Sequence, residues 1–274
     1  MAPTITLNDG RTIPQIGYGT FLVPPEDTQA RVTEALEAGY RHIDTAMIYR
    51  NEDGVGRAIA SSGIPREDLW ITTKLWNDRR GPDATRAALD ESLTKLGLDY
   101  VDLYLIHWPT PDNAPIAPTW ETFGDLQNEG LTKSIGVSNF DHRYLPEIYA
   151  TGLIPTVDQI ELHPQFQQRP TVKLADSHNV RIEAWGPLGQ GKVDYQTSII
   201  GEIANQQSAS WAQVILAWHL AKGHIVFPKS STPQRMAENL ASSELTLSAA
   251  DIAAIDALDQ GAMGRVASDP ANVN

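Results

Sequence analysis

The fold class is indicated by the stretch Val101-Asp102-Leu103-Tyr104-Leu105-Ile106, which His107 follows directly. It is almost continuously apolar or β-favouring, and so is the earlier run Leu69-Trp70-Ile71-Thr72-Thr73. Strands of a parallel sheet that is covered on both faces have this composition. The two runs therefore predict buried parallel strands in an α/β protein.

Similar short segments recur along the chain at an average spacing of about 29 residues, the size of a strand with its crossover helix. Eight such units predict a (β/α)8 TIM barrel, and a length of 274 residues fits that fold. Before the first unit, an Asn8-Asp9-Gly10 turn between alternating segments predicts an N-terminal β-hairpin. The predicted strands start near Tyr18, His42, Leu69, Val101, Lys133, Thr156, Arg181 and His224.

Segments between the strands carry helical periodicity. Leu89, Leu93 and Leu96 share one helical face. Near the end of the chain, Ser248 to Asp251 resembles a capping box and predicts an extra C-terminal helix to about Leu258. The tail 261–274 shows no period. An open doubly wound sheet is the structural alternative, but the Gly17-Tyr18-Gly19 turn lacks the third glycine of its dinucleotide-binding motif.

Composition excludes several classes of partner and several kinds of site. A net charge of −13 argues against nucleic-acid or anionic membrane partners, so a polyanionic ligand needs a local cluster of cations. The absence of cysteine excludes disulfides, thiolate metal sites and cysteine nucleophiles. We find no signal peptide and no apolar run of membrane-spanning length. We therefore expect one domain over residues 1–274, in a cytoplasmic protein for which nothing requires more than a monomer.

Polar residues close most of the predicted strands, at the barrel end where function resides. Buried charges are costly unless they are paired, so these side chains should converge on one another or on a ligand. Asp44 and Lys74 end neighbouring strands and can form an ion pair. The strand-closing residues are Asp44, Lys74, His107, Ser138, Asn139, Gln159, Trp185 and Lys229.

Tyr49 lies in the loop that begins after Asp44. A free tyrosine has a pKa of about 10, and a neighbouring ammonium such as that of Lys74 lowers it. Tyr49, Lys74 and Asp44 together therefore predict a general acid, to which His107 can add a hydrogen bond or a proton relay. A metal site is the competing use of these residue types, but the strands contain no His-x-His or His-x-x-x-His pair, and we predict none.

A positive patch follows the last strand. Lys229, Ser230 and Ser231 precede Thr232-Pro233, a good start for a helix that also carries Arg235. A helix N-terminus with hydroxyls and cations in this place of a barrel predicts a phosphate site.

The sequence resembles the aldo-keto reductase family over nearly its whole length, and most of all the bacterial 2,5-diketo-D-gluconate reductases. The matching segments are Gly39 to Ala46, Tyr49 with Asn51-Glu52, Thr72 to Trp76, Leu98 to Pro109, Gly136 to Phe140, Gln159 to Pro164, Pro228 to Ser230 and Glu238-Asn239.

The resemblance implies an NADPH-dependent oxidoreductase that reduces aldehydes and ketones to alcohols, with Asp44, Tyr49, Lys74 and His107 as a catalytic tetrad. Ser138, Asn139 and Gln159 would hold the nicotinamide carboxamide, and Trp185 would stack on the ring. The implied contacts to the rest of NADPH/NADP+ are Leu188, Gly189 and Gln190 at the pyrophosphate, Lys229, Ser230 and Arg235 at the 2′-phosphate, and Glu238 and Asn239 at the adenine.

An aromatic substrate pocket is expected around the tetrad, because Trp76 and Trp108 directly follow strand ends. The short, proline-rich segment from Thr110 to Pro118 suggests an open site for small polar carbonyl compounds, by likeness to bacterial members. The expected substrate-binding residues are Phe21, Met47, Tyr49, Trp76, His107, Trp108 and Asn139.

Two other functions are weighed against this one. A barrel aldolase could use Lys74 or Lys229 as a Schiff base, which leaves Tyr49 and the phosphate patch unexplained. A non-enzymatic, cofactor-binding regulatory subunit would not need the complete tetrad.

Overall fold

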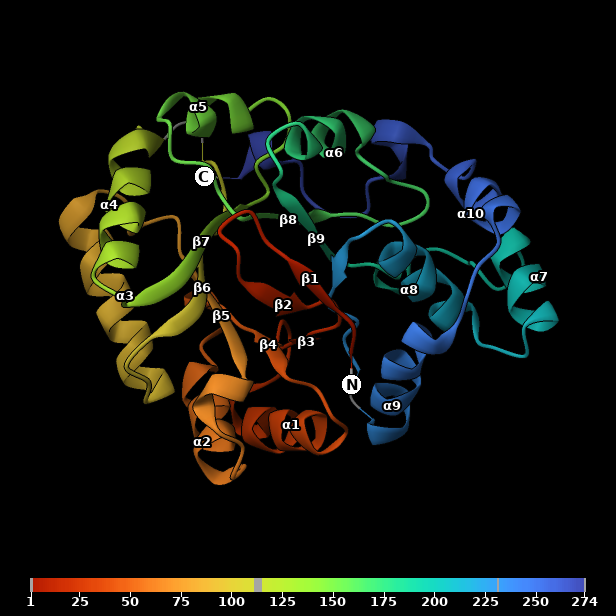
Figure 1. Cartoon of the computed structure of the whole chain (residues 1–274), viewed down its shortest axis with the longest axis horizontal. Coiled ribbons are helices and arrows are strands. Elements are labelled where there is room, and N and C mark those ends of the chain that lie inside the picture. Colours follow the sequence, from red (N-terminus) through yellow and green to blue (C-terminus); the bar gives the residue numbers. More distant parts are fainter. Residues whose placement is uncertain (1, 111–114, 231, 274) are drawn as a thin grey trace.

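A computed structural model describes residues 2–110, 115–230 and 232–273 and shows a closed parallel barrel with helices around it (Figure 1). Eight strands pair in the order β10-β9-β8-β7-β6-β5-β4-β3, and a parallel bridge from Ile16 to Val226 joins the two edges. The predicted (β/α)8 barrel is therefore confirmed, and the open sheet is wrong. The barrel strands are β3 (Tyr18–Gly19), β4 (His42–Asp44), β5 (Trp70–Leu75), β6 (Val101–Ile106), β7 (Thr132–Ser138), β8 (Val157–Glu161), β9 (Arg181–Trp185) and β10 (Ile225–Val226).

Helices surround the barrel, as Figure 1 shows. The predicted capping box is present at α10, where Ser248 Oγ accepts a hydrogen bond from the backbone N–H of Asp251. The longer helices are α1 (Pro25–Glu37), α2 (Glu52–Ser61), α3 (Pro82–Leu96), α4 (Ile116–Asn128), α6 (Arg169–Asp176), α7 (Ile199–Gln206), α8 (Trp211–Ala221), α9 (Pro233–Ala241) and α10 (Ala249–Asp256); α5 (Leu145–Ala150) is shorter.

The predicted N-terminal hairpin consists of β1 (Thr4–Thr6) and β2 (Thr12–Pro14), paired antiparallel with Ile5 opposite Ile13. It lies across the end of the barrel where the strands begin (Figure 1), because Asn8 Nδ2 donates to the carbonyl of Pro155 and Ser134 Oγ donates to Asp9. The hairpin closes that end, so the opposite end is left for ligands.

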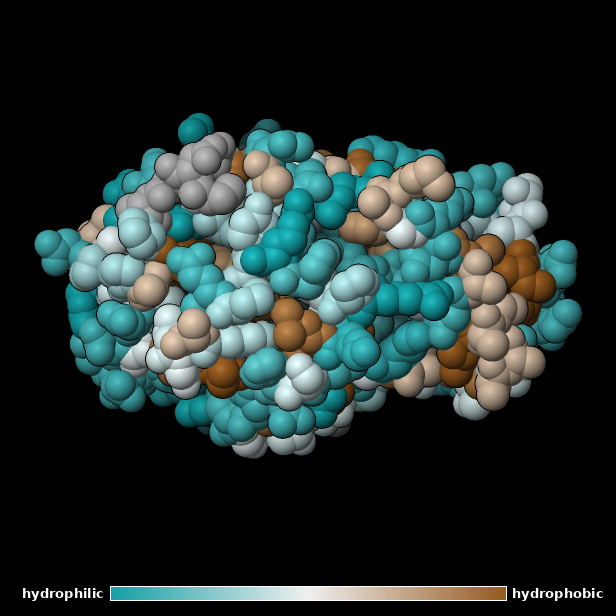
Figure 2. Space-filling model, turned by 90° about the horizontal axis from the view of Figure 1, so that it is seen from above, coloured by the Kyte–Doolittle hydropathy of each residue, from teal (hydrophilic) through white to brown (hydrophobic). Residues whose placement is uncertain are grey.

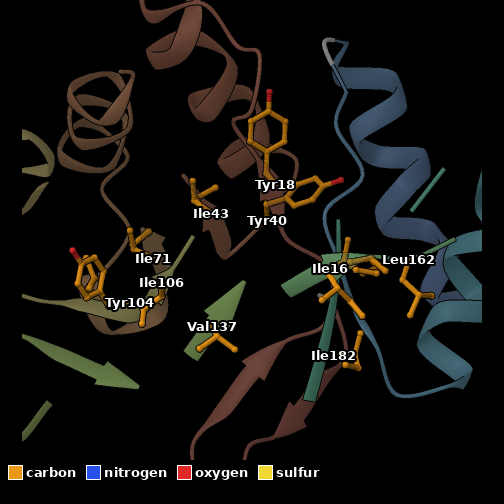
Figure 3. Packing of buried hydrophobic residues seen from close by; sticks show 14 of the residues in the cluster. Ile16, Tyr18, Tyr40, Ile43, Ile71, Tyr104, Ile106, Val137, Leu162 and Ile182 are labelled. Carbon is orange, nitrogen blue, oxygen red and sulfur yellow. The ribbon is translucent and has the colours of Figure 1, made fainter. Parts of the chain in front are cut away.

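The apolar core forms two layers. The larger one lies between barrel and helices and includes Tyr18, Tyr40, Ile43 and Tyr104 (Figure 3). The smaller one fills the barrel interior, where Leu103 and Leu105 meet Leu7 and Ile13 of the hairpin region. Each such fully buried side chain contributes roughly 1.5–3 kcal/mol to folding.

Candidate active site

Asp44 and Lys74 form the ion pair that the sequence predicts. Adjacent parallel strands β4 and β5 carry them, and both side chains point into the barrel near its C-terminal end. Lys74 Nζ lies 2.6 Å from Asp44 Oδ1 and 2.9 Å from the carbonyl oxygen of Thr45, to which it also donates. The side chains are only 1% and 7% exposed. The pair is therefore held in a low-dielectric environment with a fixed geometry.

Tyr49 ends a short 3-10 turn, η1 (Met47–Tyr49), directly after this pair. Its ring centroid lies 5.3 Å from Lys74 Nζ, and the side chain is partly exposed. Arg50 adopts a left-handed conformation with φ of 57°, which turns the chain into α2. The Tyr49 ring thus lies beside the buried ammonium and is partly accessible to solvent.

Asn51 holds this turn in place and is itself buried. Its Nδ2 donates to the carbonyls of Thr20 at 3.0 Å and Val23 at 3.1 Å, while Oδ1 accepts from Thr45 Oγ1 at 2.9 Å. One amide therefore connects the Tyr49 turn to the loop after β3 and to the residue after Asp44. Asn51 belongs to one of the motifs quoted above, but its role could not be predicted, because polar contacts between three loops leave no periodic signal.

The electrostatics of Tyr49 differ from the sequence expectation. Burial raises the pKa of Tyr49 well above its usual value, and the Asp44 carboxylate raises it further. The expectation that Lys74 lowers this pKa was wrong for the protein alone, because Asp44 neutralises the ammonium at 2.6 Å. The phenol consequently keeps its proton at neutral pH, which is the form that a proton donor requires.

His107 follows β6 and lies between Tyr49 and the aromatic wall. Its ring centroid is 5.7 Å from that of Tyr49 and 5.2 Å from that of Trp76, both edge to face. Burial and then the Lys74 charge lower the pKa of His107 well below its usual value, so the imidazole is neutral. Its Nδ1 is buried without a partner among the described residues.

Most of the residues expected to line the substrate pocket lie around the rings of Tyr49 and His107. Phe21 is half exposed and packs 5.2 Å from Tyr49, while Trp108 lies nearly parallel to His107 at 6.3 Å. Arg80 fixes the Trp108 segment by donating to the carbonyls of Trp108 and Pro109. Met47 is buried on the Tyr49 turn. Of the expected short loop after Thr110, residues 111–114 lie outside the described residues.

The residues expected at the nicotinamide carboxamide form one hydrogen-bonded group. Asn139, which has a φ of 65°, donates to the carbonyl of His107 at 2.9 Å and to Ser138 Oγ at 3.1 Å. Trp185 Nε1 donates to Asn139 Oδ1 at 2.9 Å. Ser138 Oγ donates to the backbone carbonyl of Gln159. The ends of β7, β8 and β9 are thereby connected beside His107.

The expected pyrophosphate segment follows β9 as the short turn η3 (Gly189–Gly191). Gly189 and Gln190 have φ values of 65° and 53°, and a Cβ at Gly189 would lie 3.0 Å from Val193. Leu188 packs against the core. A left-handed turn with a glycine next to bulky neighbours suits the close approach of a ligand to the backbone.

The positive patch lies at the start of α9, as predicted. Arg235 is exposed, and Lys229 Nζ donates to the carbonyl of Leu22 at 3.0 Å. Thr232 occupies the N-cap position, but its side chain makes no capping hydrogen bond; Ser231 lies outside the described residues. On the same helix, Glu238 accepts from Gln234, and Asn239 is buried.

Glu183 is a further polar residue of this site and was not predicted from the sequence. It lies inside the barrel on β9, two residues before Trp185, and accepts a hydrogen bond from Gln159 Nε2 at 2.9 Å. The alternation of a strand places residues two apart on the same face. An acid two positions before the strand-closing Trp185 was therefore a usable signal.

Two surface hollows lie away from these residues. One is lined by Asn8, Asp9 and His178 near the hairpin, and the other by residues around Arg66 and Tyr100. Among the described residues, no three His, Asp or Glu side chains are grouped to bind a metal ion.

The outer surface is mainly hydrophilic on the face that Figure 2 shows, with hydrophobic residues in separate groups. The exposed large hydrophobic residues are Phe21, Leu22 and Met263, and the first two belong to the loop beside Tyr49. In the described part of the chain, no helix combines the length and the apolar character needed to cross a membrane.

Comparison with known proteins gives one consistent answer. The pattern of the aldo/keto reductase family matches residues 15–260. An aldo-keto reductase of Mycolicibacterium smegmatis is 49% identical over 100% of this chain and 99% of its own. A methylglyoxal reductase DkgA of Yersinia pestis is 45% identical, covering 98% and 97% of the two chains. The crystal structure of a Gox0644 variant in complex with NADPH matches with a TM-score of 0.94 and 44% identity, covering 100% and 99%. The chain belongs to the aldo/keto reductase family.

Proposed function

We propose that this protein is an NADPH-dependent reductase of aldehydes and ketones, and that residues 1–274 act as one domain and as a monomer. The observation that carries the proposal is the partly exposed ring of Tyr49 beside the buried Lys74–Asp44 pair and the ring of His107. The relatives named as reductases and the NADPH complex of a similar chain support it.

The described residues fit the cofactor. Gln159 makes both of its side-chain hydrogen bonds through Nε2, which leaves its amide oxygen for the nicotinamide carboxamide, together with Ser138 and Asn139. Trp185 would stack on the ring. Leu188, Gly189 and Gln190 would line the pyrophosphate; Lys229, Ser230 and Arg235 would hold the 2′-phosphate, and Glu238 and Asn239 the adenine. When bound, NADPH supplies the hydride.

The protein supplies the proton and the orientation. Tyr49 would donate its proton to the carbonyl oxygen as the C=O π bond breaks, while the bound cofactor would supply the hydride to the carbon. The phenolate that results faces the ammonium of Lys74 and regains a proton from water. The neutral ring of His107 donates a hydrogen bond to the same oxygen and orients the substrate. Asp44 holds Lys74 in place throughout.

A Schiff-base aldolase at Lys74 is disfavoured by the same geometry. Its nitrogen donates to Asp44 and to the carbonyl of Thr45, and the side chain is only 1% exposed, so the nitrogen is enclosed and ion-paired and is not available as a free nucleophile.

The pocket favours small carbonyl substrates with polar neighbours. Trp76, Trp108 and Phe21 form the apolar wall, and Tyr49, His107 and Asn139 supply the polar contacts. The similarity to a methylglyoxal reductase supports small α-dicarbonyl compounds as a first class to test.

The test is NADPH consumption with a panel of aldehydes, α-dicarbonyls and keto sugars, ranked by kcat/KM. Tyr49→Phe is the matched control, since it removes one oxygen and keeps the ring. We expect turnover with several small carbonyls and a loss of at least about a hundredfold in the variant. No turnover with any compound, or equal turnover by both proteins, would contradict the proposal.

A further inference from the structure

Three side chains inside the barrel form a chain of hydrogen bonds next to the proposed nicotinamide site. Gln159 Nε2 donates to Asp44 Oδ2 at 2.8 Å and to Glu183 Oε2 at 2.9 Å. Gln159 and Glu183 are paired in the register of β8 and β9, and all three are buried. The ion pair is thus connected to Glu183 through one amide.

The chemistry of the two carboxyl groups decides how that amide is oriented. An ionised carboxylate only accepts hydrogen bonds, so Asp44 requires the NH2 group of Gln159. Glu183 also accepts from this NH2 group, and both of its N–H bonds are thereby used. The amide oxygen is left on the other side, free to accept a hydrogen bond.

The surroundings of Glu183 favour its neutral form. Burial and, after it, the nearby Asp44 carboxylate raise the pKa of Glu183 to about 8, against smaller lowering effects of Gln159 and Lys74. Lys74 is already paired with Asp44, and the register neighbour on β10 is the apolar Ile225. No second cation is therefore available to an ionised Glu183 among these neighbours.

We propose that Glu183 is a positioning residue that fixes the amide of Gln159 so that its oxygen faces the carboxamide of the cofactor. The inference rests on the proposed function, in which Gln159 holds that carboxamide. The contribution of Glu183 is to binding of the nicotinamide end, and it makes no contact with the adenosine end, where Lys229 and Arg235 lie.

The experiment compares Glu183→Gln with Glu183→Met. Glutamine keeps a neutral acceptor of the same shape, whereas methionine keeps the length and removes the acceptor. Dissociation constants are measured by quenching of tryptophan fluorescence for two probes: NADPH, and adenosine 2′,5′-bisphosphate, which lacks the nicotinamide. The second probe is the internal control for the integrity of the adenosine site.

We expect Glu183→Met to raise the dissociation constant of NADPH about tenfold, which is the effect of one hydrogen bond. The dissociation constant of the bisphosphate should stay within about twofold of the wild-type value. Glu183→Gln should bind both probes like wild type. If Glu183→Met does not fold, Glu183→Ala serves as the variant without an acceptor.

Three results would overturn the inference. Unchanged NADPH binding in the methionine variant would mean that Glu183 does not orient Gln159. Equal weakening of both probes would indicate a general structural role. A glutamine variant as weak as the methionine variant would show that the charge of Glu183, and not a neutral acceptor, is required. Failure of the proposed function is visible separately, because wild-type protein would then not bind NADPH more tightly than the bisphosphate.

Discussion

Replacing Lys74 by methionine should both destabilise the protein and abolish most of its activity. The ammonium is 1% exposed and lies 2.6 Å from Asp44, so its removal leaves a buried carboxylate with Gln159 as its remaining hydrogen-bond donor in the described structure. Breaking a buried pair from one side costs about 3–5 kcal/mol. For a domain of ordinary stability this is a large share of the free energy of unfolding.

The double variant Asp44→Asn, Lys74→Met separates this cost from catalysis. It removes both charges, and we expect it to recover most of the lost stability, because a buried pair contributes little net stability compared with a neutral replacement. Activity should stay low in both variants, since the phenolate of Tyr49 loses its ammonium.

Urea unfolding followed by tryptophan fluorescence gives the free energies, and NADPH consumption gives the activities. A single variant as stable as wild type would refute the reasoning on burial. A double variant with full activity would refute the role of the pair in the reaction.

Three further predictions concern the cofactor, the Tyr49 turn and pH. Arg235→Ala should raise the dissociation constant of NADPH, measured by fluorescence, at least about tenfold more than that of NADH. Equal losses of affinity would mean that Arg235 does not contact the 2′-phosphate. Asn51→Ala should lower kcat and cost about 1–3 kcal/mol in urea unfolding, because it leaves the carbonyls of Thr20 and Val23 without their donor; unchanged values would remove its role in holding the turn. Glu183 has its pKa raised to about 8 in the folded protein, so its proton is bound more tightly there than in the unfolded chain, and stability is lost as pH rises from about 4.5 to 8, by up to about 5 kcal/mol. The melting temperature of Glu183→Gln should therefore exceed that of wild type by an amount that grows from pH 5 to pH 8. A difference that stays constant over this range would contradict the prediction.

The architecture was predictable because its signals are local. The eight predicted strand starts lie within one residue of the observed ones, since continuous apolar runs such as Val101–Ile106 stand out between helices with a clear period. The Asp-Gly turn and the Ser248 capping box specify their elements through neighbouring residues alone.

Parts of the site were predictable for a different reason. Asp44, Lys74 and Gln159 end or lie near the ends of parallel strands, and a barrel brings those ends together. The ion pair followed from this geometry, whereas the assignment of cofactor contacts such as Arg235 came from family resemblance.

What the sequence could not give is the balance of competing effects in three dimensions. The pKa of Tyr49 depends on how close Asp44 lies to Lys74, because the Asp44 carboxylate offsets the effect of the Lys74 ammonium on the phenol. The contacts of Asn51 join loops that are 28 and 31 residues away, and the Gln159–Glu183 bond depends on strand register. None of these leaves a periodic pattern.

The most direct measurement is the rate of the first turnover of enzyme preloaded with NADPH, followed by the loss of NADPH absorbance after mixing with one good carbonyl substrate. Proton donation by Tyr49 predicts that Tyr49→Phe binds NADPH as wild type does but oxidises it at least about a hundredfold more slowly. A first turnover of equal rate in the two proteins would show that the proton comes from another group.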